Sequence, residues 1–165
     1  MFEPYSERAR RVIFLTRRRA GQRGAAALDI DHLVQALVLE DQGKFADEMG
    51  EPRGAFGEIA TSVLRPSVPF FAPQTASAIL VKLEQVLPQG KAIPDQEDMP
   101  ISSALGRAFD DALTLKTELH HEQVEPLHLL AAALAEPSSQ ASEALLSLGI
   151  TKEVVMNAMK GGESP

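Results

Sequence analysis

The chain has 165 residues, enough for about one compact domain with its own apolar core. It contains no cysteine, which excludes disulfides, thiolate nucleophiles and cysteine-ligated metal centres. The net charge of −7 is unevenly distributed, because residues 1–24 hold seven arginines and the remainder is strongly acidic. The start of the chain lacks the apolar core of a secretion signal, and no apolar run is long enough to span a membrane, so we expect a soluble, cytoplasmic protein.

Apolar residues recur at helical spacing through the first part of the chain. The periodicity predicts a first helix over Glu7–Arg23, with Ser6 as its N-cap and Gly24 as its stop. Further helices are expected over Asp31–Asp41, Lys44–Met49 and Ala55–Leu64.

After a proline-rich stretch, helical spacing returns and continues through the rest of the chain. It predicts helices over Gln74–Leu87, Ser102–Leu119, Pro126–Ala135, Ser138–Leu148 and Thr151–Met159. Prolines and a glycine between Pro88 and Pro100 indicate a linker there. Since no segment alternates in the manner of a strand, the sequence predicts an all-α fold.

The chain contains an internal repeat at an offset of 96 residues. This offset aligns His32 with His128 and, without a gap, Ser6 with Ser102. Each half then consists of a long helix, a loop, a shorter helix that opens just before His-Leu, and one or two smaller helices. We expect one domain over residues 1–165, with one repeat at about 1–51, a long proline-containing connector at about 52–100 and a second repeat at about 101–161.

Short motifs mark the helix starts in both halves. They are Ser6-Glu7-Arg8-Ala9-Arg10-Arg11-Val12 and Asp31-His32-Leu33, then Ser102-Ser103-Ala104-Leu105, Leu119-His120-His121 and Leu127-His128-Leu129-Leu130. In this order they resemble the Clp N-terminal domain, also called the Clp repeat domain. The resemblance extends over nearly the whole chain and implies two four-helix repeats related by a pseudo-twofold axis. It also implies a stand-alone member of the family, without ATPase modules.

Two segments resemble enzyme motifs, but each lacks residues that the chemistry requires. A phosphate loop would need glycine and a hydroxyl residue where Gln85 and Ala92 stand around Gly90-Lys91. The zinc-protease pattern that begins at His121 has Glu125 in place of its second histidine. We therefore expect no catalytic residue, no metal and no cofactor, and we expect structural, hydrogen-bonded roles for the histidines of the repeated His-Leu motif.

The resemblance implies a candidate site for peptides that carry phosphorylated arginine. In such family members a hydroxyl residue at the start of the long helix meets the phosphate, and an acid just before the histidine holds the guanidinium. Ser6 and Ser102 match the hydroxyl, and Asp31 matches the acid, but Leu127 replaces the acid in the second half. The alternative is that these side chains only cap helices.

Phe70 and Phe71 form a second candidate contact, because Pro66, Pro69 and Pro73 keep them out of a regular helix. They either fill the core between the halves or form an exposed apolar contact surface. The favoured function is a non-catalytic protein-interaction module that binds protein or peptide clients, adaptor proteins or a Clp ATPase. The alternative is a nucleic-acid-associated regulator that uses the arginine-rich first helix.

Overall fold

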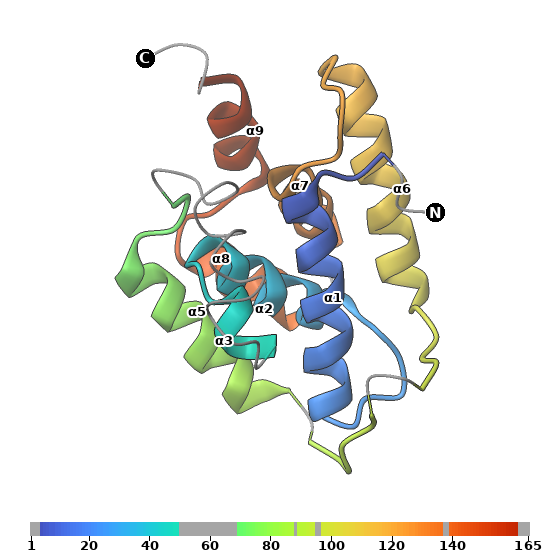
Figure 1. Ribbon diagram of the computed structural model, residues 1–165. Coiled ribbons are helices and arrows are strands. Elements are labelled where there is room, and N and C mark those ends of the chain that lie inside the picture. The colour runs from blue at the N-terminus through green and yellow to red at the C-terminus, as the bar shows by residue number, and fades with distance from the viewer. Residues whose placement is uncertain (1–3, 50–68, 88, 95–96, 137–138, 162–165) are drawn as a thin grey trace.

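The structure, a computed structural model, describes residues 4–49, 69–87, 89–94, 97–136 and 139–161. Within these ranges the fold is all-α, as predicted, with eight helices and two isolated β-bridges (Figure 1). The helices are α1 (Glu7–Gln22), α2 (Ile30–Asp41), α3 (Phe45–Met49), α5 (Pro73–Val86), α6 (Ser103–Glu118), α7 (Pro126–Leu134), α8 (Gln140–Ser147) and α9 (Lys152–Gly161). The helix expected over Ala55–Leu64 lies outside the described residues.

Local capping determines where the two long helices begin. The hydroxyl of Ser6 accepts the N–H of Ala9 at 3.1 Å, and the hydroxyl of Ser102 accepts the N–H of Leu105 at 3.1 Å. The first N–H groups of a helix have no partner within it, so each serine satisfies one of them. The first residues of α1 and α6 are 96 positions apart and both helices have 16 residues, which is the register of the sequence repeat.

The segment before each long helix pairs with the other repeat. The N–H of Ser6 donates to the carbonyl oxygen of Val124 at 3.0 Å, and the N–H of Ser102 donates to that of Leu28 at 2.8 Å. Val124 and Leu28 each donate in return to the carbonyl oxygen two residues before the serine. Exchanging the two repeats converts one set of contacts into the other, which is the behaviour of a pseudo-twofold axis.

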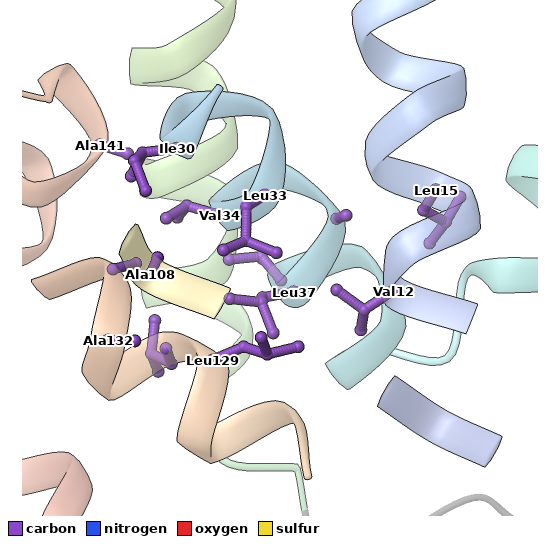
Figure 2. Packing of buried hydrophobic residues seen from close by; sticks show 14 of the residues in the cluster. Val12, Leu15, Ile30, Leu33, Val34, Leu37, Ala108, Leu129, Ala132 and Ala141 are labelled. Atoms are coloured by element: carbon purple, nitrogen blue, oxygen red, sulfur yellow. The ribbon is translucent and has the colours of Figure 1, made fainter. Parts of the chain in front are cut away.

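The central part of the core is formed by α2 and α7. Both helices are buried along most of their length, and their side chains gather with those of α1 in one cluster (Figure 2). A helix that is apolar on nearly every side is stable only in the interior, which explains why these two occupy the middle. Ile79 and Leu83 of α5, both 0% exposed, extend the cluster to the connector helix.

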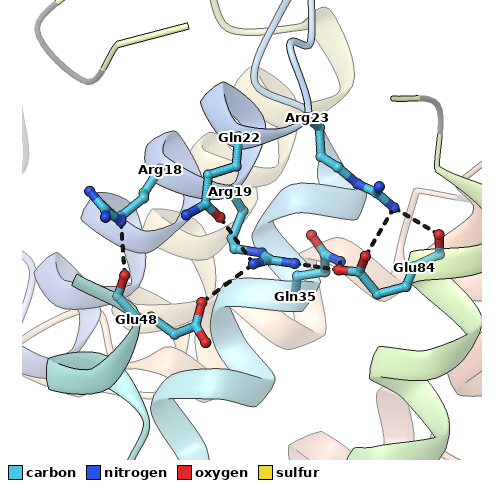
Figure 3. Close-up of polar contacts among 7 residues, drawn as sticks. All are labelled: Arg18, Arg19, Gln22, Arg23, Gln35, Glu48 and Glu84. Atoms are coloured by element: carbon cyan, nitrogen blue, oxygen red, sulfur yellow. Dashed lines mark hydrogen bonds and ion pairs between the residues drawn. The ribbon is translucent and has the colours of Figure 1, made fainter. Parts of the chain in front are cut away.

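The arginine-rich side of α1 is fastened to α3 and α5 (Figure 3). Glu84 of α5 forms ion pairs with both Arg19 and Arg23. On the other side, Arg18 donates to the carbonyl oxygen of Glu48 in α3 at 2.8 Å, and Arg19 pairs with the Glu48 carboxylate at 3.3 Å. The basic segment therefore holds three helices together.

The linker after α5 lies against the end of α1. The N–H of Gly90 donates to the carbonyl oxygen of Arg23 at 2.6 Å, and the N–H of Ile93 donates to that of Gly21 at 2.8 Å. Side chains at this contact would separate the two backbones, which explains the glycines on both sides.

Gly24→Ala is expected to destabilise the fold by about 2–4 kcal/mol. Gly24 has a φ of +67°, and an added Cβ would lie 2.3 Å from the carbonyl oxygen of Lys91. Gly149→Ala is the matched control, since its φ is +82° and no atom lies within 4 Å of the added Cβ, so only about 1 kcal/mol of backbone strain is expected. Urea unfolding measures both. Equal losses would show that the approach of the linker to α1 does not constrain the fold.

Candidate functional site

A cavity of about 610 Å³ lies between the two repeats. Its walls come from the start of α1, the end of α2, the segment before α5, the start of α7, and α9. The apolar lining residues are Leu37, Phe70, Phe71, Pro126, Leu127, Leu130, Ala158 and Met159. The polar ones are Arg8, Asp41, His121, Glu125 and His128. A mostly apolar cavity with a few polar groups is the usual form of a ligand site.

Phe70 and Phe71 both line this cavity, but they differ in exposure. Their backbone N–H groups donate to the two carboxylate oxygens of Asp41, at 2.8 and 3.0 Å, which ties this segment to the end of α2. The rings meet edge to face with centroids 4.9 Å apart. Phe71 is 4% exposed and belongs to the core, whereas Phe70 is half-buried. The aromatic pair therefore fills the core with one ring and presents the other to the cavity.

Most charges at the cavity are already engaged within the protein. Nε and Nη2 of Arg8 donate to the two carboxylate oxygens of Glu40, at 2.9 and 2.7 Å. Glu40 is 4% exposed, so this is a largely buried pair. Asp41 is occupied by two backbone N–H groups, while Glu125 is exposed and gives the cavity a negative edge.

His32 and His128 have the same role in the two repeats. Nδ1 of His32 accepts the N–H of Asp29 at 3.1 Å, and Nδ1 of His128 accepts the N–H of Glu125 at 2.8 Å. Each imidazole thus reaches back to the N-cap residue of its own helix, as in a capping box. The structural, hydrogen-bonded role predicted for both histidines is confirmed.

His128 is held in its neutral form. Burial, and after it the proximity of His121 and Lys116, lowers the pKa of His128 to about 4. In the unfolded chain a histidine titrates at about pH 6.5, so the unfolded state binds a proton at a higher pH than the folded state does. The stability that neutral His128 contributes is complete above about pH 6.5 and is lost as the pH falls through 4.

The structure does not bring Ser6 and Asp31 together. Arg8, the second residue of α1, binds Glu40 near the end of α2, whereas Asp31 is in the first turn of α2. At about 1.5 Å per residue, roughly 14 Å of helix separates these two places. Asp31 instead accepts the N–H of Ala141 at 2.8 Å and caps α8, and burial raises the pKa of its carboxyl. The Ser6 hydroxyl and the Asp31 carboxylate are thus each used as helix caps, at the starts of α1 and α8.

Ser102, rather than Ser6, lies beside the start of α2. Its hydroxyl donates to Oδ1 of Asp29 at 2.9 Å, two residues before Asp31. The prediction from the sequence placed Ser6 beside the acid of its own repeat. In the structure, each serine instead lies beside the loop of the other repeat. No local pattern in the sequence carries that information.

A second, smaller cavity lies beside the start of α6, with a volume of about 460 Å³. It is lined by Tyr5, Ile101, Ser102, Ser103, Gly106, Phe109, Asp110 and Leu113. Ser102 therefore takes part in a cavity as well as in a helix cap, whereas Ser6 is a buried cap.

Each of the seven arginines in residues 1–24 makes an intramolecular contact. The contacts are Arg8 with Glu40, Arg10 with Glu7, Arg11 with the ring of Phe45, Arg17 with the carbonyl oxygens of Pro94 and Glu97, Arg18 with Glu48, Arg19 with Glu48 and Glu84, and Arg23 with Glu84. Binding to nucleic acid depends on cations that neutralise phosphates. Because these arginines already contact groups of the protein itself, the structure argues against the nucleic-acid alternative.

Sequence reasoning identified the aromatic pair but missed several residues of the main cavity. Arg8, Asp41, Glu125 and Met159 come from four separate elements and share no motif. Within the described part of the chain, no three histidine, aspartate or glutamate side chains are placed to hold a metal ion. None of the helices in that part combines the length and apolarity needed to cross a bilayer.

Arg8→Met is expected to destabilise the protein by about 3 kcal/mol, because it leaves Glu40 buried without its partner. Arg10→Met is the control on the same helix, since Arg10 and Glu7 form an exposed pair at 3.8 Å whose removal should cost less than about 0.5 kcal/mol. Chemical unfolding at neutral pH measures both losses. If Arg8→Met costs no more than Arg10→Met, then the Arg8 pair does not support the cavity wall.

The sequence matches the family profile of the Clp repeat (R) N-terminal domain over residues 72–148 and over residues 100–161. Together the two matches extend over more than half of the chain. A search of curated protein sequences finds no match.

Solved structures with the same fold extend the similarity to the first repeat. The N-terminal domain of the caseinolytic protease-associated chaperone ClpD from Arabidopsis thaliana is 20% identical, with 98% of this chain and 97% of that chain covered and a TM-score of 0.63. The Hsp104 N-terminal domain from Candida albicans is 16% identical, with 96% and 93% covered and a TM-score of 0.59. With two helical repeats in the same register and a family match over the second, the chain belongs to the Clp repeat N-terminal domain family.

Proposed function

We propose that the protein is a non-catalytic interaction module that binds apolar segments of client or adaptor proteins in the cavity between its repeats. The observation that carries this proposal is the cavity itself, about 610 Å³ in volume, with mostly apolar walls drawn from both repeats and the aromatic segment. Its volume is within the range of about 300–1,000 Å³ that is typical of ligand pockets. Apolar walls bind by removing apolar surface from water, which suits an extended or unfolded polypeptide.

The polar groups of the cavity are suited to orienting a peptide. A guanidinium has five N–H donors, and Glu40 takes two of those of Arg8, which leaves donors for carbonyl oxygens of a ligand. Exposed Glu125 offers a carboxylate to the N–H groups of a peptide backbone or to a cationic side chain. Apolar contact would supply the affinity for a peptide, and these polar groups would set its orientation in the cavity.

The family relationship supports the same class of partner. Clp N-domains are a non-catalytic domain type that binds substrates and adaptor proteins. For this chain we propose unfolded clients, adaptors or a Clp ATPase as the partner classes. Binding of this kind needs no cofactor and no nucleotide.

Phe70→Ser is expected to weaken peptide binding about tenfold, because it removes an apolar ring from the cavity wall. The probe is a fluorescein-labelled unstructured peptide rich in leucine and phenylalanine, compared by anisotropy with a glycine-serine peptide of equal length. Phe14→Ser is the matched control, since Phe14 is 62% exposed on α1 and does not line the cavity. An unchanged affinity in Phe70→Ser, or an equal loss in Phe14→Ser, would place the binding elsewhere and refute the proposed site.

Salt dependence separates this proposal from the nucleic-acid alternative. Apolar peptide binding should be nearly constant between about 50 and 200 mM salt, because it releases few counterions. Binding to an oligonucleotide, which depends on phosphate contacts, would weaken steeply over the same range. Salt-sensitive oligonucleotide binding, together with no peptide binding, would favour the alternative.

A further inference from the structure

Two histidines in the cavity wall share a hydrogen bond. Nδ1 of His121 lies 2.8 Å from Nε2 of His128, and Nδ1 of His128 accepts the N–H of Glu125 at 2.8 Å. Because an accepting nitrogen carries no proton, neutral His128 has its proton on Nε2 and donates it to Nδ1 of His121. The neutral pair thus has a single arrangement of protons, which links the loop after α6 to the start of α7.

An added proton does not fit into this arrangement. On Nδ1 of His121 it would face the N–H of His128, and on Nδ1 of His128 it would face the N–H of Glu125. If the hydrogen bond between the rings is reversed, neutral His128 carries its proton on Nδ1, again opposite Glu125. Every placement costs one hydrogen bond, so proton uptake loosens either the contact between the rings or the cap of α7.

The charges that act on His128 do not stabilise a positive charge on it. Lys116 on α6 disfavours a positive charge on His128. The charged groups that face the cavity from the other elements are Arg8 of α1, Asp41 of α2 and Glu125 of α7, and α9 contributes the apolar residues Ala158 and Met159. The two charged groups from the first repeat are already bonded, to the Glu40 carboxylate and to two backbone N–H groups.

We propose that the His121–His128 pair is a proton-sensitive latch, which holds the first turn of α7 in place when neutral and releases it at mildly acidic pH. The inference rests on the proposed function, because that turn supplies Pro126 and Leu127 to the cavity wall. When the hydrogen bond to Glu125 is lost, an apolar ligand meets a less ordered wall. The latch therefore makes the affinity for apolar polypeptide higher near neutral pH than at mildly acidic pH.

The first repeat shows that the latch is an addition to the common fold. His32 caps α2 in the same manner as His128 caps α7. At the position equivalent to His121, however, the first repeat has Ala25, which offers no titratable group. The cap is thus shared by both repeats. The second imidazole, which adds a further place for a proton, occurs only in the repeat whose cap lies at the cavity.

His121→Asn separates the latch from the wall it holds. The side-chain oxygen of asparagine can accept the N–H of His128, but it does not titrate near neutral pH. For wild type, the affinity for the labelled leucine-phenylalanine peptide, which carries no titratable side chain, should be at least about fivefold weaker at about pH 5 than at about pH 7.5. His121→Asn should bind equally at both pH values, because the imidazole that remains, His128, has a pKa of about 4 and stays mostly neutral at about pH 5.

His120→Asn is the matched control for that variant. His120 is exposed, adjacent in sequence and at a φ of 60°, a conformation that asparagine adopts readily. It should keep the wild-type pH dependence. Circular dichroism at about pH 5 should retain the full helical signal in all three proteins, and a loss of helix in all of them would overturn the latch as a local device.

A measurement without ligand tests the latch directly. In wild type, acidification should shift the amide proton resonance of Glu125 and lower its protection against hydrogen exchange, measured relative to the intrinsic exchange rate at each pH, whereas His121→Asn should show neither change. Peptide binding that is equal at both pH values, or an unchanged Glu125 amide, would overturn the latch while leaving the proposed function intact. No peptide binding at about pH 7.5 would overturn the proposed function and the regulatory role together.

Discussion

Backbone pairing between the repeats sets the positions of nearly all other features. Because the N–H of Ser6 bonds to Val124 and the N–H of Ser102 bonds to Leu28, each loop before a central helix is held against the other repeat's long helix. A buried backbone group without a partner is costly, so these bonds maintain the register whatever side chains surround them. The repeats can therefore diverge in sequence while the start of each long helix still pairs with the other half.

Sequence divergence between the repeats has made the regions around the starts of α2 and α7 chemically different. Asp31 caps α8, while Leu127 at the equivalent position faces the cavity. Ala25 is small and apolar, while His121 at its equivalent bonds to the capping histidine. One repeat thus uses these positions for internal packing, and the other presents them to a cavity, although the two repeats share one fold.

The excess of arginine near the start of the chain is explained by packing. A guanidinium is planar and donates in several directions, so one side chain can join two helices. Arg19 does so between Glu48 and Glu84, and Arg23 adds a second bond to Glu84. Since partly buried ion pairs gain little net stability, their main effect here is to orient α5. The segment that leads into α5 carries Phe70, so the arginine contacts also help to position the cavity wall.

The amino-acid sequence by itself determined the eight helices in the described part of the chain, the serine caps of α1 and α6, the 96-residue repeat and the family resemblance. These features depend on residues within a turn of each other, or on one constant shift along the chain, and both leave a visible pattern. Only the tertiary structure decided that Ser102 rather than Ser6 adjoins α2, that the arginines bind neighbouring helices, and that the cavity draws on both repeats. The reason is physical, because which loop faces which helix follows from packing between distant segments, and no spacing in the sequence encodes it.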